Sequence, residues 1–373
     1  MCAAGLPIAI VSYMRRFGIA AGLVLTFLAG CASSTEGHSI GPSQDIVTSG
    51  EDQPSTTAEL PAAVATKKIH LIANIGDSIS QAMDADDSMP VDVNMIATDP
   101  DAVFHDFPHL SWIQGTDPRI GSVASHYKEL DPSLVVVPFS RSGAEMVSKP
   151  LLRPTMVDQA TDLIEADLHP DLVFVLLGGN DICNRAKASG NLATANLFPV
   201  SRWVEEIDKG LTILANGLDA GTTVKVLSMP RVDRLYDSAG DARFTAKYSG
   251  INTSLSCKQF WSATDMMNKG VCPIITTETD PARRAAIGER IDQYNDALAA
   301  EVRRFSSDRA LNPKGIVFQS DWHGAVGKGG EKDGSMGTFA FTAEQVSKRD
   351  CFHPSVVGQA AVAKMVLETA KWE

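Results

Sequence analysis

The stretch Ile69-His70-Leu71-Ile72-Ala73-Asn74-Ile75-Gly76-Asp77-Ser78 decides the fold. Its first seven residues are mostly apolar, as expected of a strand that is buried on both faces of a sheet. Gly76 then lets the chain turn sharply, and Ser78 can stand where a helix begins. A buried strand that ends in a glycine turn is typical of a parallel sheet in an α/β domain.

The rest of the body alternates short apolar runs with longer amphipathic stretches. The predicted strands are 69–75, 134–139, 172–177, 224–227 and 316–319. The predicted helices are 120–129, 156–166, 200–218, 281–305 and 355–372. Because crossover helices cover both faces of a parallel sheet, we predict a three-layer α/β/α sandwich around a central parallel sheet of about five strands.

Two segments interrupt this alternation. Residues 81–119 are acidic and rich in Met, Asp and Pro, and residues 231–280 contain two of the cysteines. Both segments are long for structureless loops. We therefore expect these insertions to wall or cover a substrate site.

The N-terminal region predicts export and lipid attachment. Met14-Arg15-Arg16 is a charged start, residues 17–27 are an apolar core, and Leu28-Ala29-Gly30-Cys31 is a small-residue cleavage site that ends in cysteine. A transmembrane anchor is the alternative, but the apolar stretch is short for a bilayer span. We interpret residues 1–31 as a lipoprotein signal peptide with its lipobox, and Cys31 as the acylated residue.

The predicted organisation after Cys31 is a tether and one large domain. Residues 32–66 are rich in Ser, Thr, Gly, Pro and acidic residues and lack an apolar period, which predicts a flexible tether. The domain then occupies 67–373. Ala32 is not the aspartate that retains lipoproteins in the inner membrane of enteric bacteria. We therefore expect an exported cell-envelope lipoprotein, held at the outer membrane or cell surface.

Export makes the cysteines of the body candidates for disulfides. They are Cys183, Cys257, Cys272 and Cys351, which allow three connectivities. We favour Cys257–Cys272 because it closes the shortest loop, which leaves Cys183 to pair with Cys351. Free buried thiols remain the alternative.

Charge and missing motifs exclude several classes of function. The net charge of −12, without a basic run in the body, disfavours nucleic acid, because phosphate binding needs clustered Lys and Arg. Small neutral substrates, or those with a cationic headgroup, fit better. The sequence lacks His-Glu-x-x-His, the phosphate-binding Gly-x-x-x-x-Gly-Lys-[Ser/Thr] and the Gly-x-Ser-x-Gly elbow. We expect no metal, no cofactor and a monomer.

Polar motifs follow the first three predicted strands, where open α/β sheets bind their ligands. They are Gly76-Asp77-Ser78-Ile79, Ser140-Arg141-Ser142-Gly143 and Gly178-Gly179-Asn180-Asp181. The glycines let backbone N–H groups approach a ligand, and Asn180 offers an amide donor. Each motif alone is equally an ordinary turn.

A fourth motif, Asp350-Cys351-Phe352-His353-Pro354, precedes the last predicted helix. An aspartate three residues before a histidine can hold the imidazole Nδ1 and leave Nε2 to take a serine proton. Alone, Asp-x-x-His is more often a helix cap or a metal-ligand fragment. The four motifs in this order, however, point to one site.

In these motifs the sequence resembles the GDSL/SGNH hydrolase family, which implies a flavodoxin-like α/β sandwich. The match rests on Ser78, Gly143, Asn180, and Asp350 with His353, although Ile79 stands where the family usually has leucine. The resemblance implies Ser78 as nucleophile, His353 as general base and acid, and Asp350 as its orienter. It also implies an oxyanion hole made of the Ser78 and Gly143 N–H groups and the Asn180 amide.

The resemblance leaves several functions open. Gly178–Cys183, Asp350–His353 and Ser111-Trp112 look like the phospholipase B-like branch, which favours a lipolytic hydrolase of small-molecule or lipid acyl esters. A carbohydrate O-acetylesterase and a non-catalytic binding lipoprotein of the envelope are the alternatives. Apolar residues of the first insertion are candidates for an acyl pocket, although ordinary packing explains them equally well: Met89, Met95, Ile96, Phe104, Phe107 and Trp112.

Overall fold

A five-stranded parallel sheet of order β3-β1-β4-β5-β8 forms the centre of the computed structural model, which describes residues 68–88, 90–99, 104–147, 153–248, 250–325 and 334–373. Its strands are β1 (Leu71–Gly76), β3 (Val135–Pro138), β4 (Leu172–Leu176), β5 (Thr223–Leu227) and β8 (Val317–Ser320). All four neighbouring pairs run parallel. The predicted sheet and its five strands are confirmed.

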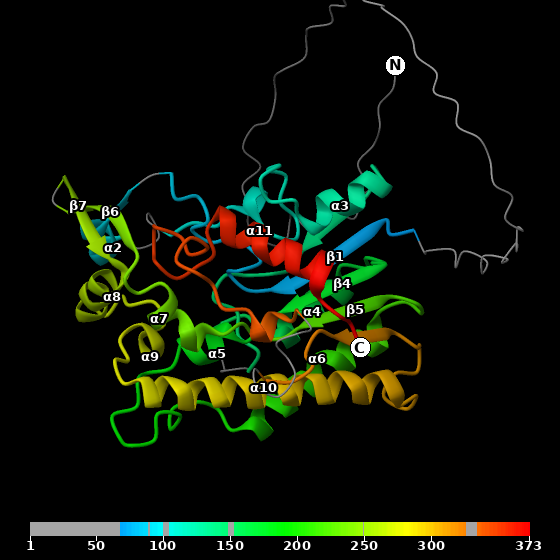
Figure 1. Ribbon diagram of the computed structural model, residues 1–373. Helices are drawn as coiled ribbons and strands as arrows, with labels where there is room; N and C mark the ends of the chain where they lie inside the picture. The colour runs from blue at the N-terminus through cyan, green and yellow to red at the C-terminus, as the bar shows by residue number, and fades with distance from the viewer. Residues whose placement is uncertain (1–67, 89, 100–103, 148–152, 249, 326–333) are drawn as a thin grey trace, which may run out of the picture. The chain divides into compact units, whose positions relative to one another are not determined.

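Helices cover both faces of this sheet (Figure 1). On one face lie α3 (Val123–Leu130) and α11 (Val356–Lys364), which continues into a π-helical turn, η6 (Met365–Thr369). On the other face lie α4 (Met156–Glu165), α6 (Val200–Gly217) and α10 (Pro281–Ser307). The three-layer α/β/α prediction is therefore confirmed.

Side-chain hydrogen bonds cap the first turns of α4 and α11. The Thr155 hydroxyl and the Asp158 carboxylate form a capping box at α4, and the Ser355 hydroxyl accepts the Gly358 N–H at α11. β4 is buried along its whole length, as the central strand of a covered sheet must be. Between α6 and α10, the rings of Trp203 and Tyr294 stack with centroids 4.4 Å apart.

The two insertions combine into a second, smaller sheet of order β2-β6-β7. The first insertion supplies β2 (Val91–Asp92) and α2 (Val93–Thr98), and the second supplies the antiparallel hairpin β6 (Arg243–Tyr248) and β7 (Ile251–Ser256). The short helices of the second insertion are η3 (Val232–Arg234), α7 (Leu235–Ser238), α8 (Cys257–Met266) and α9 (Pro273–Thr276). Elsewhere lie η2 (Pro108–Leu110), α5 (Gly179–Cys183) and η5 (Met336–Thr338). Sequence patterns did not predict these elements.

The disulfide pairing differs from the prediction. Cys183 bonds Cys272, and Cys257 bonds Cys351, with Cα–Cα distances of 4.0 and 5.5 Å. The predicted pairs Cys257–Cys272 and Cys183–Cys351 are therefore both wrong. The prediction took loop length as a measure of distance, but α8 begins at Cys257 and its ten helical residues alone span about 15 Å. The second insertion is therefore attached by one disulfide to the segment that follows Asn180 and by the other to the segment that contains His353.

Some predictions fall on other parts of the chain. The signal peptide at 1–31, its Cys31, the tether at 32–66 and Met89 lie outside the described residues. Within the described ranges, no helix is both long enough and apolar enough to cross a membrane.

Candidate active site

Ser78 follows strand β1, in a turn that requires glycine. A Cβ on Gly76 would lie 2.4 Å from the Ser80 hydroxyl oxygen, so no larger residue fits without a shift. The Gln159 side chain of α4 fixes this turn, because it accepts the Gly76 N–H at 2.8 Å and donates to the Gly76 carbonyl at 3.0 Å. Ser78 is only 5% exposed and lines a cavity.

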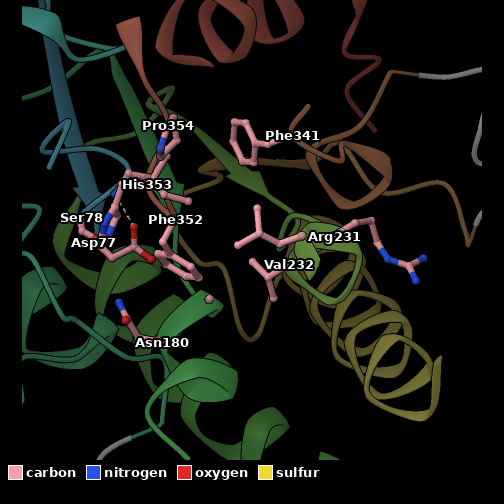
Figure 2. Close-up of a pocket in the computed structure, with 12 residues that line it drawn as sticks. Asp77, Ser78, Asn180, Arg231, Val232, Phe341, Phe352, His353 and Pro354 are labelled. Atoms are coloured by element: carbon pink, nitrogen blue, oxygen red, sulfur yellow. Dashed lines mark hydrogen bonds between the residues drawn. The ribbon is translucent and has the colours of Figure 1, made fainter. Parts of the chain in front are cut away.

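The structure brings His353 and Asp350 to Ser78. His353 Nε2 lies 2.8 Å from Ser78 Oγ (Figure 2). On the other side of the ring, His353 Nδ1 hydrogen-bonds the Asp350 carboxylate. The other Asp350 oxygen accepts the backbone N–H groups of Phe352 and His353, at 2.9 and 3.0 Å. A carboxylate can only accept, so Nδ1 carries the proton and Nε2 is free to take the one from Ser78.

The electrostatics of His353 fit a base. Burial alone lowers its pKa, but the charge and hydrogen bond of Asp350 outweigh burial, so the His353 pKa is raised above its ordinary value. Asp77, next to the serine, is also buried, and burial raises its pKa to about 6 although the Ile79 N–H opposes this shift. The site therefore holds two buried side chains, His353 and Asp77, whose pKa values are both raised.

The motifs after β3 and β4 are joined to each other. Asn180 donates its side-chain amide to the Ala144 carbonyl at 3.0 Å, and the buried Asp181 carboxylate accepts the Met146 and Val147 N–H groups at 2.7 and 2.9 Å. These bonds hold the loop in which Gly143 has a φ of +80°, a conformation suited to glycine. From the sequence motif alone, Asp181 is only a turn residue.

The proposed oxyanion donors are only partly assembled around the cavity. Ser78 and Asn180 line it, whereas Gly143 does not. Within the part of the chain that the structure describes, the backbone N–H groups of Ser78 and Gly143 donate to no carbonyl or side chain. Gly143 is linked to the Asn180 motif only through its neighbour Ala144, whose carbonyl accepts the Asn180 amide.

A cavity that is open to solvent lies beside Ser78. Much of its lining is apolar, and the aromatic rings of Phe341 and Phe352 face the cavity (Figure 2). Arg231 also borders it, but its guanidinium points away and pairs with Asp233 and Asp292. The full lining is Asp77, Ser78, Ile79, Gly179, Asn180, Arg231, Val232, Leu235, Phe341, Phe352, His353 and Pro354.

The second insertion, and not the first, supplies wall residues. Val232 and Leu235 lie in the segment 231–280, as expected of a substrate-site wall. In contrast, Ile96 and Trp112 are fully buried in the core, and Met95 is 41% exposed. Phe104 and Phe107 are partly buried against the core. The acyl-pocket interpretation of the first insertion is therefore replaced by its alternative, ordinary packing.

One group of potential metal ligands occurs among the described residues. Donor atoms of Asp84, Asp350 and His353 lie within 4.8 Å of one another. His353 Nδ1 and Asp350, however, are already bonded to each other, and a cation between them would break that bond. The group is therefore better described as the hydrogen-bonded Asp350–His353 pair with a third buried carboxylate, Asp84, beside it.

Comparison with known proteins places the chain in a family. The GDSL-like Lipase/Acylhydrolase profile matches residues 72–366, whereas no curated protein sequence matches. One solved crystal structure is 13% identical with a TM-score of 0.38, over 80% of this chain and 94% of its own. Another, an active site mutant of a family two carbohydrate esterase from Clostridium thermocellum, is 10% identical with a TM-score of 0.36, over 80% and 63%. At these TM-scores neither structure bears on activity. Because the profile spans most of the chain, the protein belongs to the GDSL-like lipase/acylhydrolase family.

Proposed function

We propose that this protein is a carboxylic ester hydrolase in which Ser78, His353 and Asp350 form a catalytic triad. The observation that carries the proposal is the 2.8 Å contact between Ser78 Oγ and His353 Nε2, with Asp350 on the opposite nitrogen. A serine hydroxyl is a poor nucleophile until a base takes its proton, and this geometry supplies that base.

The reaction proceeds in two steps. Ser78 Oγ attacks the ester carbonyl while its proton passes to His353 Nε2, and the resulting tetrahedral intermediate expels the alcohol, which takes the proton from His353. Water then attacks the acyl-enzyme carbonyl and gives a proton to His353. The second tetrahedral intermediate releases the acid, and the leaving Ser78 oxygen takes that proton back from His353, so both residues are regenerated. The proposed oxyanion donors are the Ser78 and Gly143 N–H groups and the Asn180 amide, each worth about 2.7–4 kcal/mol in the barrier.

The substrate we propose is an ester with an apolar acyl chain. An acyl chain would lie against uncharged side chains of the cavity: Val232, Leu235, Phe341 and Phe352. The Arg231 guanidinium does not disturb this surface, because it is turned away from the cavity. Each buried methylene contributes about 0.8 kcal/mol. The phospholipase B-like motifs noted in the sequence favour a lipid or phospholipid ester within this class.

The proposed location is the cell envelope, with Cys31 acylated. The lipobox supports it, and so do the two disulfides, which persist in oxidising compartments. Acyl chains on Cys31 would keep the active site near membrane lipids without a spanning helix.

Chain-length selectivity tests the substrate class. We expect kcat/KM of the wild type for p-nitrophenyl esters to rise from acetyl toward octanoyl. The variant Val232→Phe should lower kcat/KM for the octanoyl ester roughly tenfold and leave that for the acetyl ester within about twofold. Val317→Phe is the matched control, because Val317 is exposed at the opposite end of the sheet. Hydrolysis of acetyl esters alone would contradict the acyl pocket and favour the O-acetylesterase alternative.

A further inference from the structure

Asp84 is a buried carboxylate beside the Asp350–His353 pair that the proposed mechanism leaves unused. It is completely inaccessible to solvent and lies in the turn after β1, in the first insertion. Its Oδ1 atom accepts the His105 N–H at 3.2 Å and the Arg349 Nε–H at 3.1 Å. Its Oδ2 atom is buried and hydrogen-bonds none of the described residues.

The backbone of Asp84 is fixed against the segment that leads to the triad. Its N–H donates to the His105 carbonyl at 2.8 Å, and its carbonyl accepts the Ser347 hydroxyl at 2.5 Å. Its φ of +53° is unusual for a residue with a side chain. Strained conformations of this kind persist where the surroundings enforce them, which is common at functional sites.

We propose that Asp84 is a positioning residue that acts on His353 through the buried network Asp84–Asp350–His353 and sets the pH at which His353 becomes a base. This inference rests on the proposed function. One carboxylate oxygen of Asp84, one of Asp350 and one ring nitrogen of His353 lie within 4.8 Å of one another. At this distance buried charges interact strongly, because water is excluded.

Burial and the neighbouring carboxylates act on the His353 pKa in opposite directions. Asp350, Asp84 and Asp77 favour the protonated imidazole and raise the His353 pKa, whereas burial lowers it. Burial, and then the charge of Asp350, raise the pKa of Asp84 to about 7, although His353, the His105 N–H and Arg349 oppose this shift. Asp84 and His353 therefore influence each other's ionisation and titrate as a coupled pair.

The protonation of His353 governs how kcat/KM depends on pH. The neutral imidazole is the active base, so kcat/KM falls as the pH drops through the His353 pKa. Asp84→Asn removes a negative charge that raises this pKa, so the variant should stay active at lower pH. Because the Asp84 carboxyl has a pKa of about 7, its charge acts on His353 mainly above that pH, so we expect the ratio of kcat/KM at pH 7 to that at pH 8.5 to rise roughly twofold over wild type.

Asp321→Asn is the matched control. Asp321 is also completely buried and accepts the Ser228 and Met336 N–H groups, both at 2.7 Å, but it is not among the groups that act on His353. We expect it to lower the melting temperature and leave the pH profile unchanged. An Asp84→Asn profile that superimposes on wild type would overturn the inference.

A measurement on the wild-type protein covers the case in which Asp84→Asn does not fold. The ¹⁵N chemical shifts of the His353 ring, assigned by their loss in His353→Gln, should titrate in two steps because Asp84 ionises beside it. A single step would overturn the inference. Failure of the proposed function looks different, because Ser78→Ala would then hydrolyse esters as fast as wild type.

Discussion

Replacing Ser78 with alanine is expected to lower kcat on the order of 10⁶-fold, and replacing His353 with alanine should cost about the same. The two side chains act as one unit, because the 2.8 Å contact between Oγ and Nε2 serves a single proton transfer. The double variant Ser78→Ala/His353→Ala should therefore be no slower than either single variant.

Steady-state hydrolysis of a p-nitrophenyl ester checks this prediction, with His323→Ala as the matched control. His323 bonds the Lys371 carbonyl at 2.8 Å and does not line the cavity, so its loss should leave kcat within about twofold. Independent effects of Ser78 and His353 that multiply in the double variant would contradict a shared step.

Removing either disulfide is the second change with a large expected effect. The two bonds join residues 89 and 94 positions apart. Loops of that length constrain the unfolded chain by about 4.7 kcal/mol in the chain-entropy account. We expect Cys183→Ala/Cys272→Ala and Cys257→Ala/Cys351→Ala each to lower the free energy of unfolding by about 4 kcal/mol.

The two double variants should differ in catalysis. Cys351 lies between Asp350 and His353 with a φ of +58°, and its bond to Cys257 ties this turn to α8. We expect its loss to lower kcat per folded molecule more than loss of the Cys183–Cys272 bond. Urea unfolding and kcat under folded conditions measure the two effects, and an equal kcat in both variants would contradict a positioning role for the Cys257–Cys351 bond.

The central sheet could be predicted because its strands carry a strong signal. A strand covered by helices on both faces is apolar at nearly every position, as β4 is from Leu172 to Leu176. The second sheet carries no such signal. β2 has only two residues, and β7 is mostly exposed with the polar run Asn252-Thr253-Ser254.

The residues of the candidate triad could be located because each lies beside a recognisable element. Ser78 comes after a strand and His353 before a helix, so sequence order alone brings them to the same edge of the sheet. Asp84, Val232 and Phe341 carry no comparable motif, because their place at the site depends on how the insertions and the 334–342 loop fold. The disulfide pairing failed for a related reason, since loop length ignores the helix α8 between Cys257 and Cys272.

Covalent labelling tests most directly the central claim that Ser78 is an activated nucleophile. We predict that a fluorophosphonate adds once per chain, that peptide mass spectrometry places the adduct on Ser78, and that His353→Ala slows labelling by several orders of magnitude. Ser125→Ala, which removes a half-buried hydroxyl from α3, should label as fast as wild type. An adduct on another residue, or labelling of Ser78 that is as fast without His353, would contradict the account.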